Sequence, residues 1–208
     1  MNLANQVTLA RFGLSLVYFG VLAAVLGSDR EPAVLLDTAF ALFVIASGTD
    51  FLDGWLARRQ GTVTSFGRVA DPFVDKILVC GSMVFLAAAR PTATILPAWM
   101  VVAVLVREFV VHEIRSRAEA RGVAFGASAW GKIKMVFQCL AIGALLLVWG
   151  RWRGETWLEP LTRTLVWTQL TLTLVSGALY AWSARQALRA DATAPPEAGP
   201  TGAPAIKE

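Results

Sequence analysis

The sequence predicts an all-α polytopic membrane protein with six transmembrane helices. Of its 208 residues, 56% are hydrophobic and 16% are charged, whereas a soluble domain has about 25% charged residues. The mean hydropathy is +0.56. At about 20 residues per transmembrane helix, the length allows about six spans with short connections. This composition excludes a disordered chain, a coiled coil and most soluble enzymes, and a net charge of +4 does not indicate a nucleic-acid partner.

Six apolar runs mark the expected spans, and they are Phe12–Ser28, Ala33–Gly48, Ile77–Ala89, Ile95–Val106, Met135–Gly150 and Thr164–Ala184. Several are shorter than a usual span, so we expect the second, third and fourth helices to place polar residues on their final turns, inside a shared water-filled cavity. Residues 1–190 then form a single transmembrane domain. Its first ten residues are expected to form a short interfacial segment. Residues 191–208, rich in Ala, Pro, Gly and Thr, predict a disordered tail.

The distribution of Lys and Arg predicts the orientation. With the N-terminus in the cytoplasm, fourteen of the 19 basic residues fall on the cytoplasmic side, which satisfies the positive-inside rule. Both termini are then cytoplasmic, in a multi-pass protein of a bacterial-type cell membrane. Trp149, Trp152 and Trp157 suit an aromatic belt at the opposite surface. Cys80 and Cys139 lie in apolar runs, and we expect packed thiols rather than a disulfide.

Carboxylates are concentrated in one polar stretch. Asp50 and Asp53 share one helix face with Gly54 and Ala57, because these positions follow at i, i+3, i+4 and i+7. Two further aspartates, Asp71 and Asp75, share a face of the next helix.

Four carboxylates facing one another would repel unless cations lay between them. Mg²⁺ and Mn²⁺ prefer carboxylate oxygen, so we expect two such ions and a phosphoryl or pyrophosphate substrate. Gly54 and Ala57 would leave room for that substrate, and Arg58 would bind phosphate in a bidentate manner.

Two other interpretations fit single residues of this stretch. Asp71, before Pro72, could be a helix N-cap, and the aspartates could form a solvated helix end paired with nearby basic residues. A divalent-cation transporter would also need intramembrane aspartates. However, the fixed charge of Arg58 would oppose the passage of a cation.

The complete pattern, Asp-x2-Asp-Gly-x2-Ala-Arg-x8-Gly-x3-Asp-x3-Asp, resembles the signature of the CDP-alcohol phosphatidyltransferase family. Its positions are Asp50, Asp53, Gly54, Ala57, Arg58, Gly67, Asp71 and Asp75. The resemblance implies six transmembrane helices, a homodimer, and a two-metal site that opens to the cytoplasm and uses CDP-diacylglycerol. It also implies that Asp50, Asp53 and Asp71 are metal ligands, and that Asp75 is both ligand and general base. The nucleotide substrate would bind Gly54, Ala57, Arg58 and Gly67, together with Asn5, Thr8 and Thr64.

The expected acceptor-binding residues are basic and lie outside this pattern, at Arg107, Arg115, Lys132 and Lys134. They lie on the expected cytoplasmic side and would attract an anionic acceptor. The segments around Glu108, Lys134 and Gln138 resemble the branch of the family that uses glycerol 3-phosphate. Inositol phosphate, serine and phosphatidylglycerol remain alternative acceptors.

Overall fold

The computed structural model describes the backbone of residues 3–28, 33–60, 65–120, 129–150, 152 and 154–193. Side chains are described within residues 9–28, 33–49, 76–118, 131–150 and 154–186, and at positions 74 and 152. This part of the chain forms seven helices and no strand, namely α1 (Leu3–Leu26), α2 (Ala33–Gln60), α3 (Ser65–Ala88), α4 (Arg90–Ala93), α5 (Ala98–Ala120), α6 (Ala129–Trp149) and α7 (Leu158–Thr193). The predicted all-helical fold is confirmed.

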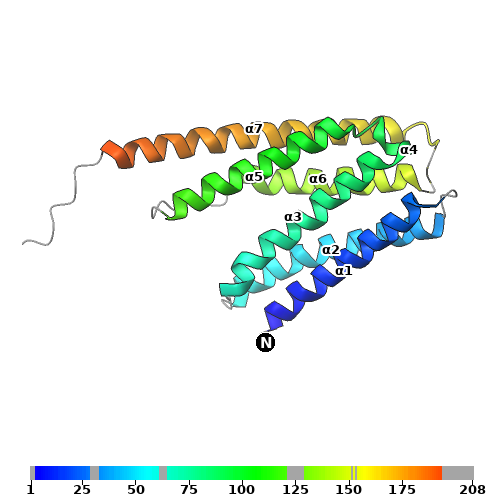
Figure 1. The fold of residues 1–208 in the computed structure, drawn as a ribbon, viewed down its shortest axis with the longest axis horizontal. Helices are drawn as coiled ribbons and strands as arrows, with labels where there is room; N and C mark the ends of the chain where they lie inside the picture. The colour runs from blue at the N-terminus through cyan, green and yellow to red at the C-terminus, as the bar shows by residue number, and fades with distance from the viewer. Residues whose placement is uncertain are drawn as a thin grey trace, which may run out of the picture.

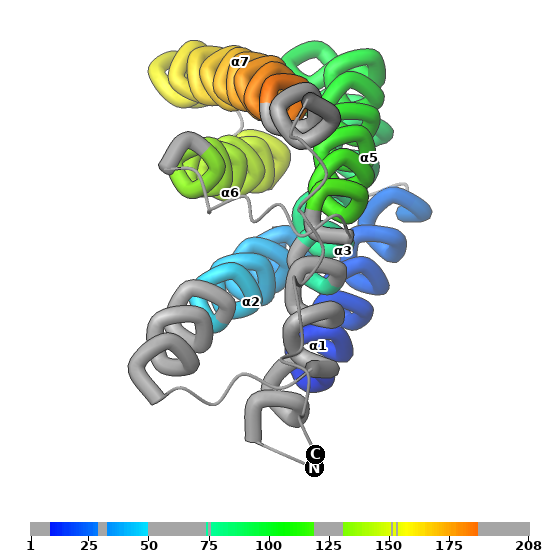
Figure 2. Tube along the Cα trace, turned by 90° about the vertical axis from the view of Figure 1, so that its left-hand side faces the viewer, coloured from blue at the N-terminus to red at the C-terminus, as the bar shows by residue number. Residues whose placement is uncertain are grey.

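The long helices run back and forth along one axis (Figure 1). Helix α1 contacts both α2 and α3, whereas α7 contacts both α5 and α6. Contacts of α2 with α6 and of α3 with α5 and α6 join these two groups. Figure 2, viewed along the helices, shows the two groups one above the other. The start of α1, the end of α2, the start of α3, the end of α5 and the start of α6 consequently lie at one end of the molecule.

A continuous apolar core fills the space between the helices. Its largest fully buried side chains include Tyr18, Phe43, Leu78, Leu86, Met100, Ile142 and Leu145. Helices α1 and α3 approach closely where the Phe19 ring lies over Gly81, because a Cβ at that position would overlap the ring. The Phe19 ring also stacks on Phe85, with 5.6 Å between ring centroids.

The helix boundaries differ from the expected spans at several points. Helix α1 begins at Leu3, so the proposed interfacial segment continues into the first span without a break in the helix. The helix of the expected fourth span, Ile95–Val106, starts three residues later than predicted, because α5 begins only at Ala98, after Pro97. Proline lacks the backbone N–H of a helix interior, which explains the later start. Helix α7 continues to Thr193, so it includes the first three residues of the predicted tail, and residues 194–208 lie outside the described part.

Two described segments are long and apolar enough to cross a membrane, Leu9–Leu26 and Gly131–Trp149. The apolar stretches Ala33–Thr49 and Lys76–Ala88 are shorter. Six spans therefore remain a prediction. Cys80 and Cys139 are not joined in a disulfide, as predicted.

Candidate active site

The buried face of α2 leads directly into the carboxylate pattern. Its buried residues follow at spacings of three and four, and they are Leu36, Ala39, Phe43 and Ala46. Residues with this spacing share one face of a helix. The same spacing continues along α2 to Asp50, Asp53 and Ala57. The face of α2 that is buried in the bundle thus changes from apolar to acidic positions toward the C-terminal end of the helix.

Helix α3 repeats this change in the opposite chain direction. Leu86, Ser82 and Leu78 are buried, and the same spacing continues toward the start of the helix at Asp75 and Asp71. Because α2 ends where α3 begins, the four aspartate positions lie in the halves of these helices that are directed toward the same end of the bundle.

The corresponding face of α1 also ends in polar residues. Its buried positions are Val25, Leu22, Tyr18, Ser15 and Arg11, and Thr8 is the next position with the same spacing. Since α1 contacts both α2 and α3, three helices contribute polar positions to this end of the bundle.

The chemistry of the donor set fits Mg²⁺ or Mn²⁺, because all four positions on these faces supply carboxylate oxygen. The side chains of Asp50, Asp53, Asp71 and Asp75 lie outside the described residues. The same is true of the expected substrate-binding side chains of Asn5, Thr8, Gly54, Ala57, Arg58 and Gly67, and of Thr64 as a whole. Their metal-binding and substrate-binding roles remain predictions.

A second charged cluster joins α5, α6 and α7. The Glu108 carboxylate accepts a hydrogen bond from Arg107 Nη1 at 2.7 Å and another from Lys134 Nζ. All three side chains are nearly buried, with exposed fractions of 10–12%. An ionised carboxylate between two cations offsets the cost of burying these charges, and removing it would leave both cations uncompensated.

Arg107 is bound mainly to α7. Its Nε donates to the Thr173 carbonyl oxygen at 3.0 Å, and its Nη2 donates to Ser176 Oγ at 2.8 Å. Gly177 makes room for this arginine, since a Cβ there would lie 2.9 Å from Arg107 Cγ. Arg107 therefore ties α5 to α7 and orients Glu108, which in turn holds Lys134 of α6.

Beside this cluster is a small cavity of about 70 Å³. Its lining comes from α3, α5 and α6, and consists of Lys76, Val79, Cys80, Glu108, Gly131, Lys134, Met135 and Gln138. Lys76 follows Asp75 directly in the chain, so the cavity lies next to the acidic end of α3. Among the described residues, the charged side chains of this lining are two lysines and one glutamate, which suits a small anionic ligand.

Comparison with known proteins decides the family. The family model described as CDP-alcohol phosphatidyltransferase matches residues 1–175. This chain belongs to the CDP-alcohol phosphatidyltransferase family. The predicted resemblance is thereby confirmed, as is the expectation of an enzyme of this family. Family membership and the two candidate spans together indicate an integral membrane protein.

Several curated family members resemble the chain over most of its length. A Bacillus subtilis protein named CDP-diacylglycerol–glycerol-3-phosphate 3-phosphatidyltransferase is 35% identical, over 86% of this chain and 93% of its own. A Haemophilus influenzae protein of the same name is 31% identical, over 90% of this chain and 97% of its own. A Mycobacterium tuberculosis protein named probable phosphatidylglycerophosphate synthase is 38% identical, over 70% of this chain and 66% of its own.

The four basic residues predicted for the acceptor have different surroundings in this phosphatidyltransferase. Lys134 is buried and lines the cavity, whereas Lys132 is exposed. Arg107 is not among the residues that line the cavity, because α7 and Glu108 bind its guanidinium. Arg115 lies two helical turns farther along α5 and is partly buried. The structure thus brings Arg107 and Lys134 together around one carboxylate, and it leaves Lys132 outside the cavity.

Sequence reasoning assigned no role to Glu108, Lys76 or Gln138. Glu108 was detectable as an acidic residue at the end of an otherwise apolar run, where burial requires a charged partner. Gln138 lies one helical turn beyond Lys134 on α6, so it shares the face of that lysine. Its Nε2 donates to Met83 Sδ at 3.4 Å. Lys76 offered no such signal, since it follows the acidic pattern like a solvated basic residue.

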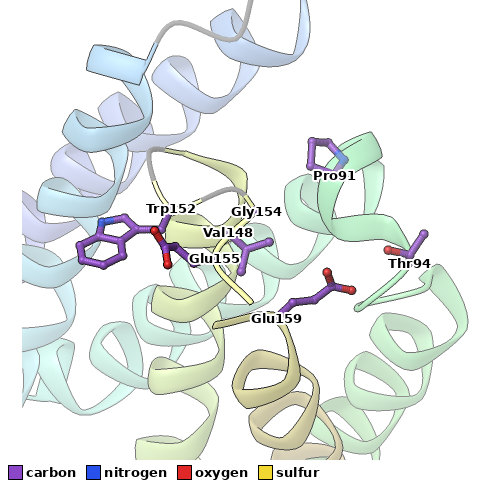
Figure 3. A pocket seen from close by; sticks show the side chains of 7 residues that line it. All are labelled: Pro91, Thr94, Val148, Trp152, Gly154, Glu155 and Glu159. Carbon is purple, nitrogen blue, oxygen red and sulfur yellow. The ribbon is translucent and has the colours of Figure 1, made fainter. Parts of the chain in front are cut away.

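A larger cavity of about 140 Å³ lies at the other end of the bundle, between the loop before α7 and the turn around α4 (Figure 3). Glu155 and Glu159 both line it, but their carboxylates point in different directions (Figure 3). Glu159 pairs with Arg163 at 2.8 Å. This cavity is remote from the aspartate positions, and its two carboxylates do not converge on a common ligand.

Proposed function

We propose that this chain transfers the phosphatidyl group of CDP-diacylglycerol to sn-glycerol 3-phosphate, releasing CMP and forming phosphatidylglycerophosphate. The observation that supports this acceptor most strongly is the 35% identity to a named glycerol-3-phosphate phosphatidyltransferase over 93% of that relative. The positively charged cavity beside the acidic end of α3 agrees with an anionic acceptor. Family membership favours this transferase over a cation transporter.

In the proposed reaction, the acceptor hydroxyl oxygen attacks the phosphorus that bears diacylglycerol, and the bond from that phosphorus to CMP breaks. Asp75 takes the hydroxyl proton as general base. Asp50, Asp53, Asp71 and Asp75 would hold two Mg²⁺ or Mn²⁺ ions. When bound, these ions supply charge stabilisation to the diphosphate and to the leaving CMP.

The cavity beside α3 is the proposed binding site for the acceptor phosphate. Lys134 is the best placed of the four predicted residues, because it is buried and its ammonium group is held at the cavity by Glu108. Arg107 acts through Glu108 as a positioning residue. Arg115 and Lys132 then contribute to the positive field through which the acceptor approaches the cavity.

The proposal includes the membrane arrangement expected from the sequence. Residues 1–190 form one catalytic transmembrane domain with six spans, and the site opens to the cytoplasm. Two copies of the chain form a homodimer in contact with membrane lipids.

Product analysis tests the proposed function. The purified protein is incubated with CDP-diacylglycerol, Mg²⁺ or Mn²⁺, and glycerol 3-phosphate, inositol phosphate, serine or phosphatidylglycerol in turn. Mass spectrometry should detect phosphatidylglycerophosphate and CMP only with the first acceptor and only with metal. Asp75→Asn should lose most of this turnover, because the amide cannot accept the hydroxyl proton, and Asp37→Asn, at the opposite end of α2, is its control. Turnover with only one of the other acceptors would assign the chain to another branch of the family. Turnover in the presence of a chelator would contradict the proposed metal requirement.

A further inference from the structure

Arg11 is a buried charge to which the proposed reaction assigns no role. Its residue exposure is 4%. It continues the buried face of α1 that includes Ser15 and Tyr18. Burying a guanidinium is costly unless anions lie nearby. The positions of α2 and α3 that face Arg11 therefore indicate its role.

The contact between α1 and α2 gives the first neighbour. The rings of Tyr18 and Phe43 lie 6.0 Å apart, and the two helices run in opposite directions. Seven residues before Tyr18 is Arg11, and seven residues after Phe43 is Asp50. A step of seven residues nearly restores the same helix face and covers about 10.5 Å along the axis. Arg11 and Asp50 are therefore positions at the same depth, on the faces through which α1 and α2 meet.

The contact between α1 and α3 gives the second neighbour. Phe19 of α1 lies over Gly81 and stacks on Phe85. Phe19 is therefore at the same depth in the bundle as the α3 residues midway between Gly81 and Phe85. These helices run in the same direction. Eight residues earlier on each helix are Arg11 and the turn that contains Asp75. Asp75 also precedes the buried Ser82 by seven residues, so the two positions nearly share one face of α3.

We infer that Arg11 is a fixed cation of the aspartate site and that it offsets the charge of the diphosphate of CDP-diacylglycerol. This inference rests on the proposed function. Four carboxylates balance two divalent ions, which leaves the two negative charges of the diphosphate uncompensated. Arg58 of the sequence pattern supplies one positive charge, and Arg11 supplies the second from α1. Arg11 is thus a positioning residue for the nucleotide substrate.

Charge-removing and charge-keeping variants test this role. In Arg11→Gln, the KM for CDP-diacylglycerol and the Kd for CDP should rise by about ten- to a hundredfold, as expected for the loss of a charged hydrogen bond. The KM for glycerol 3-phosphate should stay unchanged. Mn²⁺ affinity measured by calorimetry should equal or exceed that of the wild type, because a cation next to the metal ions has been removed. Arg11→Lys should recover part of the CDP affinity, since it keeps the charge but lacks the planar fork.

Arg11→Met removes the same charge without leaving a buried amide, and replaces Arg11→Gln if that variant does not fold. Arg185→Gln, at an exposed arginine of α7, is the control. Unchanged CDP affinity in the charge-removing variants would overturn the inference. So would a fall in Mn²⁺ affinity that parallels a lower Tm in all Arg11 variants, because a purely structural role predicts that result. A wild-type protein that neither binds Mn²⁺ nor consumes CDP-diacylglycerol would instead refute the proposed function.

Discussion

The aspartate positions of α2 and α3 and the charged cluster of Arg107, Glu108 and Lys134 are two charged regions that lie toward the same end of the bundle. The aspartates lie on consecutive helices, so their spacing is visible in the sequence. The charged cluster joins Glu108 to Lys134 across 26 positions and Arg107 to Ser176 across 69 positions. Periodicity shows which residues share a helix face, but it does not show which helices share a charged partner.

Asp75→Asn should show most clearly that the aspartate positions carry the chemical step and the charged cluster does not. If Asp75 is the general base, kcat should fall by about 10²- to 10⁴-fold, because the amide cannot accept the hydroxyl proton. The Kd for CDP and the KM for glycerol 3-phosphate should change little, because the amide can still offer one oxygen to a metal ion. Steady-state kinetics and calorimetry provide these values, and near-normal kcat would remove the base assignment. Asp50→Ala should instead weaken Mn²⁺ binding, since a metal ligand is lost.

Glu108→Gln tests whether the charged cluster depends on a single carboxylate. The substitution leaves Arg107 and Lys134 as buried cations without their shared anion, which costs about 3 to 5 kcal/mol in the free energy of unfolding. Glu113→Gln breaks only an exposed pair with Arg117 and should cost under about 1 kcal/mol. Unfolding in detergent measures both. Equal losses in the free energy of unfolding would show that the burial of this ion-pair cluster does not determine how much it stabilises the protein.

Lys134→Gln and Lys132→Gln test which of the two lysines binds the acceptor. The first should raise the KM for glycerol 3-phosphate by about ten- to a hundredfold, because it removes a charge-assisted hydrogen bond. The second should raise it by less than about fivefold, since an exposed charge contributes under about 1 kcal/mol. The KM for CDP-diacylglycerol is the internal control. A larger effect at Lys132 would place the acceptor outside the cavity.

Gly177→Ala tests how closely Arg107 packs against α7. The new methyl group would displace the Arg107 side chain, and overpacking of this kind costs about 1 to 3 kcal/mol. Gly48→Ala on α2 is the matched control, because a Cβ there meets nothing within 4 Å and alanine is the better helix former. Thermal unfolding compares the two. Equal Tm values would mean that Arg107 moves aside without cost.

The sequence was sufficient to predict the helical class, the family and the aspartate pattern, because each depends on composition or on local spacing. It did not predict that α5 begins only at Ala98, because the apolar run already starts at Ile95, before Pro97. The different exposure of Lys132 and Lys134 could have been predicted, since residues two positions apart on a helix point about 200° away from each other. The hydrogen-bond partners of Arg107 could not be predicted from the sequence, because they depend on how α5 packs against α7.

The spacing that runs from the buried residues of α2 into its aspartates also limits how this helix can change in length. One residue inserted between Ala46 and Asp50 would turn every later position by about 100°, and the carboxylates would leave the face that meets α1. Seven inserted residues would restore the direction but would move the carboxylates about 10.5 Å along the axis, away from the depth of Arg11. Rotation and depth are satisfied together by a single segment length, so this stretch of α2 should resist insertions and deletions even where its individual side chains can be replaced.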